Sequence, residues 1–154
     1  MLQSNQINNE NALPPIKNEA INSQGKIRIL AFDVNFANKE TVVDEDILLV
    51  KLPKTNCRIL QIGLVVKEGT DTDTFSLILE DILYNNIKGG YSIVKSANLK
   101  TGIAFANGDS MVLYINKVVA PIETANVEKY IALKSSIDFT KDNLINGYVL
   151  YIAD

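Results

Sequence analysis

The chain has 154 residues, with 15 Lys and Arg, 18 Asp and Glu, no His, one Cys and no Trp. This length is typical of a single domain, which buries about two-thirds of the surface of its unfolded chain. The absence of His excludes most hydrolytic triads and almost all zinc sites, and a single Cys excludes an internal disulfide. The net charge of -3 argues against a basic surface that follows nucleic-acid phosphates.

The first residues have neither the basic nor the apolar region of a secretory signal. No later apolar run approaches the ~20 residues of a membrane-spanning helix. We therefore expect a soluble protein that binds neither a membrane nor nucleic acid.

Residues 1–24 differ in composition from the rest of the chain. They are rich in Asn, Gln, Ser and Glu, have no aromatic residue, and show neither a strand period nor a helix period. The sequence predicts an extended polar N-terminal arm over residues 1–24 and a folded domain over residues 25–154. A loose terminus and an arm that docks on another surface remain equally open, since termini are ordered only when something holds them. The candidate partner contacts in the arm are Ile7, Leu13, Pro14, Pro15, Ile16 and Ile21.

Short runs of β-branched and aromatic residues begin at residue 26 and are separated by Gly, Asn, Asp and Pro, as in an all-β fold. The first predicted strand covers residues 26–36. Its alternation slips near Leu30, which indicates either a bulge or a strand covered on both faces. The second strand covers 47–52 and ends before Pro53. The third covers 58–67, and because both of its faces are fairly apolar we expect it to lie centrally in a sheet.

A fourth strand is predicted over residues 74–80, and the turn residues between it and the third strand favour a hairpin of these two. Residues 81–101 are interrupted by paired Asn and paired Gly residues, which predicts a long connection with a turn of helix or minor strands. The remaining strands are predicted over residues 102–106, 111–119, 130–135 and 147–152. A helix over 126–134 is a weaker alternative, because the apolar residues there also alternate.

These segments predict an all-β protein with eight or nine strands, folded as an antiparallel β-sandwich of the jelly-roll kind. Nothing in the chain is long enough for a helical crossover between parallel strands. We expect the C-terminus to be paired into a sheet.

The carboxylates are the only candidates for acid–base catalysis. They cluster at residues 44–46, 71–73 and 80–81, which we expect to be solvated turns or strand ends. Residues 71–73 have the oxygen density of a Ca²⁺ site but lack the spacing of an EF-hand loop. Cys57 precedes an apolar strand and is expected to be a small buried residue. The sequence therefore predicts no catalytic, metal-binding or cofactor-binding residues, and no enzyme.

The order of several segments resembles a group of small virion proteins of tailed bacteriophages. In this order, Leu-Pro-Lys at 52–54 precedes the aliphatic strand at 58–67. A Thr-rich hairpin tip follows that strand, and the segment at 75–81 comes after the tip. Asn-Gly-Asp at 107–109 and the closing Gly-Tyr-Val strand at 147–152 match the last two features of that pattern. The resemblance covers residues 42–152.

The resemblance implies a β-sandwich protein of the head decoration, head-fibre or auxiliary capsid group, without catalytic residues. It implies binding to the major capsid protein or another virion protein, a homo-oligomer with a trimer slightly preferred, and a place in the virion after assembly in the host cytoplasm. A tail or fibre-base protein is one alternative. A module that binds carbohydrate or a cell surface is another, if tyrosines such as Tyr114, Tyr130, Tyr148 and Tyr151 are exposed rather than in the core or at edges.

Overall fold

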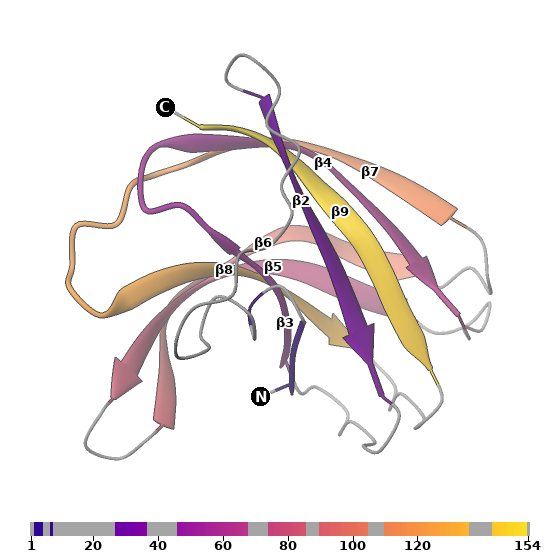
Figure 1. The fold of residues 1–154 in the computed structure, drawn as a ribbon, viewed down its shortest axis with the longest axis horizontal. Helices are drawn as coiled ribbons and strands as arrows, with labels where there is room; N and C mark the ends of the chain where they lie inside the picture. Colours follow the sequence, from indigo (N-terminus) through magenta and orange to yellow (C-terminus); the bar gives the residue numbers. More distant parts are fainter. Residues whose placement is uncertain are drawn as a thin grey trace.

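The computed structural model describes residues 2–4, 7, 27–36, 46–67, 74–85, 90–104, 110–135 and 143–153. Within these ranges the chain forms nine strands (Figure 1). Their bounds are β1 Leu2–Gln3, β2 Ile27–Asn35, β3 Asp46–Leu52, β4 Cys57–Val66, β5 Thr74–Asn85, β6 Gly90–Ala104, β7 Ser110–Val119, β8 Val127–Ser135 and β9 Leu144–Ala153. No helix in these ranges has the length and apolar character needed to cross a membrane.

The strands form two sheets that face each other (Figure 1). The five-stranded sheet has the order β1-β3-β8-β5-β6, and the four-stranded sheet has the order β2-β9-β4-β7. Apart from the parallel pair of β1 with β3, neighbouring strands are antiparallel. From β2 to β5 and again from β6 to β9, successive strands alternate between the sheets. This connectivity is that of a jelly roll, which confirms the predicted antiparallel β-sandwich.

Most predicted strands are confirmed with small shifts of their ends. The run at 58–67 is central as expected, because β4 lies between β9 and β7. Residues 130–135 belong to β8, so the helical alternative there is wrong. The slip near Leu30 is not a bulge, since β2 pairs with β9 without a register shift. Ile29 and Leu30 are both half-buried, in keeping with a strand partly covered on both faces.

Two predictions about connections are wrong. Residues 58–67 and 74–80 do not form a hairpin, because β4 and β5 belong to different sheets. Turn residues between two strands allow either a return within one sheet or a passage to the other, and local sequence does not distinguish them. Residues 81–101 are not a long connection with a turn of helix or minor strands either, because β5 continues to Asn85 and pairs with the fifteen-residue β6. Residues 102–104 of the predicted strand at 102–106 are the end of β6, and residues 105 and 106 lie outside the described residues.

The main core lies between the two sheets and is apolar. Its largest fully buried side chains include Phe36, Phe75, Ile59, Ile62 and Leu77. Alternation along each strand sends these residues inward, as expected for a sandwich. Burial of this layer is the main source of the stability of the fold.

A second apolar cluster covers the outer face of the five-stranded sheet. Ile7 is fully buried there against Leu48, Ile82, Tyr130 and Ala132. β1 pairs with β3 at the edge of this sheet, and the backbone N–H of Ser4 donates to the carbonyl of Leu48 at 2.9 Å. The described residues at the start of the chain therefore lie on the chain's own sandwich. The proposed boundary between residues 24 and 25 stays a prediction.

Candidate functional site

The strand register of the four-stranded sheet determines which side chains point away from the core. We call this set the outer face. It has four rows across β2, β9, β4 and β7. The rows are Ile27, Ile152, Arg58 and Val118; Ile29, Leu150, Gln61 and Tyr114; Ala31, Tyr148, Gly63 and Val112; and Asp33, Asn146, Val65 and Ser110. Only two of these residues, Arg58 and Asp33, carry a charge.

The outer face is unusually apolar for a surface in water. The exposed fraction is 76% for Tyr114, 61% for Val118, and 46% for both Ile27 and Val112. The solvated side of an antiparallel sheet normally carries polar residues in alternation with the core. A contiguous exposed apolar patch indicates an interaction site more often than a single exposed residue does.

An aromatic ring covers a glycine at the centre of this face. Gly63 of β4 lies directly opposite Tyr148 of β9, and a Cβ atom on Gly63 would come within 2.9 Å of the Tyr148 hydroxyl oxygen and closer to the ring. The Gln61 side-chain amide donates to the Tyr148 hydroxyl at 2.9 Å. The Tyr148 ring therefore lies across Gly63, which has no side chain to block it. The hydrogen bond from Gln61 fixes the hydroxyl end of the ring.

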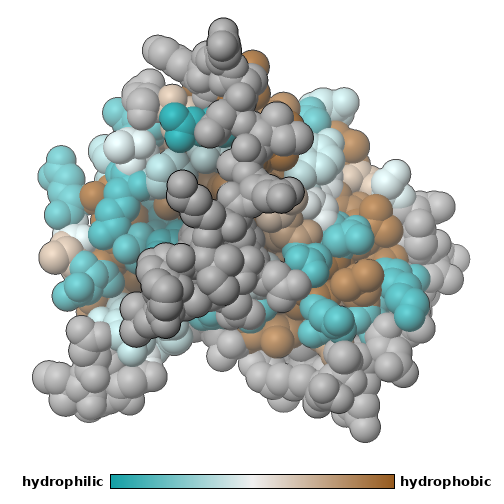
Figure 2. All heavy atoms as spheres, in the orientation of Figure 1, coloured by the Kyte–Doolittle hydropathy of each residue, from teal (hydrophilic) through white to brown (hydrophobic). Residues whose placement is uncertain are grey.

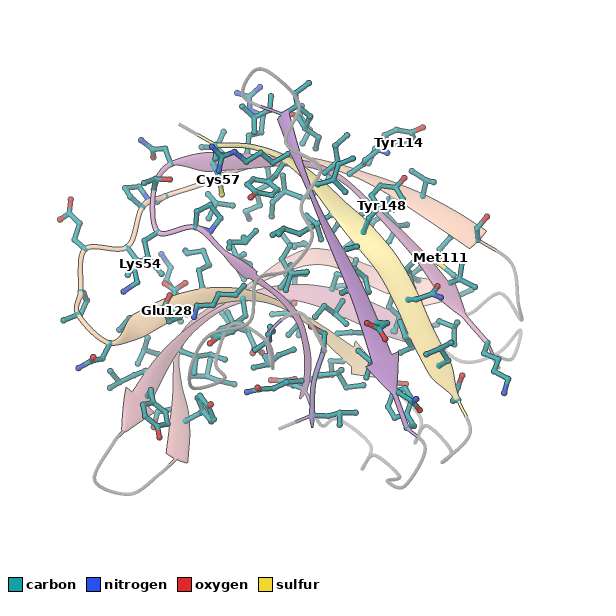
Figure 3. The ribbon with its side chains drawn as sticks, in the orientation of Figure 1. Lys54, Cys57, Met111, Tyr114, Glu128 and Tyr148 are labelled. Carbon is teal, nitrogen blue, oxygen red and sulfur yellow. The ribbon has the colours of Figure 1, made fainter. Side chains whose placement is uncertain are left out.

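A shallow groove of about 800 Å³ crosses the outer face beside this ring, and its lining includes Ala31, Val65, Val112 and Tyr148. Figure 3 shows Tyr114 and Tyr148 on the same side of the four-stranded sheet, with Met111 beyond them near the start of β7. In Figure 2, apolar residues are visible on the right of the molecule among hydrophilic ones. The face is thus apolar and open, with a shallow groove across it.

Two irregularities shape the edge of the face. The β4–β7 register shifts between Ile59 and Gln61, and Asn116 of β7 adopts a positive φ of 47° at the same level. A bulge of this kind bends an edge strand and blocks the addition of a further strand. The free edge at β7 is therefore less suited to a partner than the flat face beside it.

The carboxylates are not all solvated, which corrects the sequence prediction. Glu80 lies within β5 and is 2% exposed, and Asp46 begins β3 and is 8% exposed. Burial, followed by a hydrogen bond with Asp46 and its negative charge, raises the pKa of Glu80 from 4.5 to about 8. The Lys134 ammonium lies 3.4 Å from Asp46 Oδ1 and opposes this shift. The sequence prediction failed because the outward face of this sheet is itself covered.

This carboxyl pair has no route to a substrate, because the Glu80 Oε2 atom is inaccessible to solvent and lacks a hydrogen-bond partner among the described residues. No group of three or more His, Cys, Asp or Glu that could hold a metal occurs in the described ranges. The acidic residues at 71–73 lie outside them. The structure thus offers no arrangement of described side chains that favours catalysis.

Two further ion pairs join strands within and around the five-stranded sheet. Lys129 of β8 lies 2.9 Å from Asp81 of β5, and both side chains are mostly buried. Lys54 lies 3.3 Å from Glu128 at the surface (Figure 3). Cys57 is buried as predicted, and burial raises the pKa of its thiol. A protonated, buried thiol is a poor nucleophile.

Of the candidate contacts in the N-terminal segment, the structure describes Ile7, and it lies inside the chain's own apolar cluster rather than on an open surface. The other candidates lie outside the described residues, so their role stays a prediction: Leu13, Pro14, Pro15, Ile16 and Ile21.

The sequence analysis did not identify the outer face. The sequence pattern that could have identified it is a set of apolar residues at outward positions, which alternate with the core positions of the same strands. These are residues 27, 29, 112, 114 and 118. Tyr114 is exposed, Tyr148 is half-buried, and Tyr130 and Tyr151 are buried, so the four tyrosines divide between surface and core.

Comparison with known proteins gives fold-level similarity. No protein-family model matches the chain, and no curated protein matches it in sequence. A chain in the solved structure of the capsid of Ralstonia phage GP4 aligns with a TM-score of 0.51 and 15% identity, over 91% of this chain and 90% of that one. A chain in the structure of infectious bursal disease virus Gx strain aligns with a TM-score of 0.45 and 11% identity, over 90% of this chain and 36% of that one. The similarity to the phage capsid chain extends over nearly the whole of both chains and supports the jelly-roll assignment.

Proposed function

We propose that this protein is a structural component of a virus particle, an auxiliary, decoration or head-fibre protein that binds the capsid of a tailed phage. The observation that carries the proposal is the jelly-roll connectivity of this chain, together with its structural similarity over nearly its whole length to a chain of the Ralstonia phage GP4 capsid. The segment order of residues 42–152 supports the same assignment. Fold alone does not determine function, so the proposal also rests on the surface of the molecule.

The surface of the described residues favours assembly over catalysis. It presents an apolar sheet face, and the carboxylates of Glu80 and Asp46 are almost entirely buried. In this proposal the partner is the major capsid protein or another virion protein, and the protein also associates with itself. Leu13, Pro14, Pro15, Ile16 and Ile21 are the proposed contacts to the partner, because spaced apolar residues on an extended segment can enter grooves of a larger surface.

Co-sedimentation with capsids tests the proposal. The purified protein is mixed with mature capsids that lack it, and binding is measured in the pellet. We expect saturable binding, and weaker binding for a variant with Leu13→Asp and Ile16→Asp. Val94→Lys on β6 is the matched control, because Val94 is already 55% exposed. Absence of binding, together with absence of the protein from purified virions, would contradict the proposal.

A tail or fibre-base location is the nearest alternative. Peptide mass spectrometry on separated heads and tails distinguishes it, since the proposal requires the protein in the head fraction. A carbohydrate-binding role is supported by one feature, the 76% exposure of Tyr114, because exposed aromatic rings can stack on sugars. A glycan array in which wild type binds and Tyr114→Ala does not would favour that role.

A further inference from the structure

The outer face of the four-stranded sheet has few of the charged residues that normally keep an exposed sheet face from associating with another molecule. In its four rows it has no Lys and only one acidic residue, Asp33. The largest exposed fractions on it belong to Tyr114 and Val118. Leaving such a patch in water has a free-energy cost proportional to its apolar area.

We propose that the outer face packs against the same face of a second copy of this chain, giving a two-fold symmetric dimer. This inference deepens the self-association included in the proposed function, but it does not depend on where in a virion the protein lies.

The shape of the face selects the kind of partner. A flat, twisted sheet with β-branched side chains packs best on another sheet, at a separation of ~10 Å and with strands within ~30° of one another. Ala31 on the edge strand β2 is small, and the Tyr148 ring lies over Gly63, so these residues leave room on the face for side chains of the other copy. A second copy offers a sheet face of this same kind.

The opposite sheet also has exposed apolar residues at the end where β5 meets β6, namely Tyr84, Tyr91, Ile93 and Val94. The part of its outer face that carries the Ile7 cluster is closed, because Leu48, Ile82 and Ala132 are at most 1% exposed. The Val94→Lys variant described below distinguishes the two surfaces. A two-fold contact uses the same patch on both copies, so it covers both apolar faces at once and closes the assembly at two.

The charges on the face are compatible with a two-fold arrangement. Arg58 lies in the first row and Asp33 in the last, at opposite ends of the face. When two copies pack with their strands running in opposite directions, the Arg58 end of one copy faces the Asp33 end of the other. No like charges are then brought together at the interface.

The area of the face indicates how strong the proposed dimer can be. Four strands spaced ~4.8 Å apart, with rows spanning seven residues at ~3.3 Å each, give on the order of 500 Å² per copy. The total of about 1,000 Å² is at the lower limit of specific interfaces. Interfaces of this size are typically weak and transient, so we expect a dissociation constant in the micromolar range.

Sedimentation equilibrium of the full chain tests the inference, at loading concentrations from about 1 to about 200 µM. The expected result is a reversible equilibrium between 17.0 kDa and twice that mass. Val112→Lys and Val118→Lys place a charge on the face at residues that are already exposed, and each should raise the dissociation constant at least ~10-fold. Val94→Lys, 55% exposed on β6 of the other sheet, is the matched control and should leave it unchanged. Far-ultraviolet circular dichroism verifies that each variant is folded.

Several results would overturn the dimer. A wild-type protein that is monomeric over the whole range would do so, as would a trimer, or a dimer that both face variants leave intact. A dimer that Val94→Lys dissociates equally would also overturn it. If wild type is monomeric but Val118→Lys abolishes capsid co-sedimentation, the face binds a capsid partner, and the proposed function survives while the dimer does not.

Discussion

The Tyr148 ring lies flat across Gly63 on the neighbouring strand, in the space that any larger residue at position 63 would occupy. The Gln61 side chain holds the Tyr148 hydroxyl at 2.9 Å. This relationship makes the outer face smooth where two β-strands pair, and it explains why a glycine is present in the middle of a central strand, where it is otherwise unfavourable.

Substitution of Gly63 and of Gly147, which lie on the neighbouring strands β4 and β9, should destabilise the fold to different extents. A Cβ on Gly63 meets the end of the movable Tyr148 side chain, whereas a Cβ on Gly147 meets backbone, including Leu64 Cα at 2.9 Å. Overpacking typically costs ~1–3 kcal/mol, so we expect Gly63→Ala near the lower end and Gly147→Ala at the upper end or beyond. Urea unfolding measures both. Gly90→Ala, where nothing lies within 4 Å, is the control and should be nearly neutral.

Glu80 should make stability depend on pH in an unusual direction. Its pKa is raised from 4.5 to about 8 by burial and by Asp46, so the folded state favours the protonated carboxyl. The stabilisation is complete below pH 4.5 and is lost as the pH rises through 8, by up to ~1.4 kcal/mol per pH unit. Glu80→Gln should remove this dependence and unfold at higher urea concentration than wild type at pH 9. Identical slopes of stability against pH in the two proteins would contradict the assignment.

The buried and the exposed ion pair should contribute very different amounts to the free energy of unfolding. Asp81→Asn leaves the Lys129 ammonium buried without its partner at 2.9 Å, which should cost ~3–5 kcal/mol. Glu128→Gln removes the exposed partner of Lys54 and should cost less than ~1 kcal/mol. Thermal or urea unfolding of the two variants provides the comparison. Equal losses would show that the Asp81 pair is not buried in solution.

Ile7 should behave as a core residue of this chain. Because it is fully buried with Leu48, Ile82 and Tyr130, Ile7→Ala should destabilise the isolated protein by ~2–4 kcal/mol. Leu2→Ala, at a half-buried position of β1, should cost less. A stability unchanged by Ile7→Ala would mean that this residue leaves the sandwich in solution, as the arm prediction requires for a contact to a partner.

The strands of this fold could be predicted from sequence because alternation is a local signal. Phe32 and Val34 of β2, and Ile62 and Leu64 of β4, occupy alternate positions and point inward. The pairing of the strands was harder to predict from the sequence. Whether the chain after Val66 returns in the same sheet or passes to the other depends on contacts far away in sequence, and the turn residues are compatible with both.

The polar and apolar surfaces were harder to predict than the core. Glu80 occupies an outward position, and its burial follows from the Ile7 cluster on the same face, which the strand pattern of residues 74–80 does not contain. Tyr114 and Val118 also occupy outward positions, and their alternation was visible in the sequence. Only the register of β7 beside β4 shows that they join Tyr148 in one continuous face.

Cryo-electron reconstruction of the virion that carries this protein is the most direct test of a structural role. We predict ordered density for a jelly roll with the strand orders β1-β3-β8-β5-β6 and β2-β9-β4-β7, bound on the capsid in multiple symmetric copies. Purified virions that contain no copy of the chain, and whose capsid shows no such density, would contradict the account.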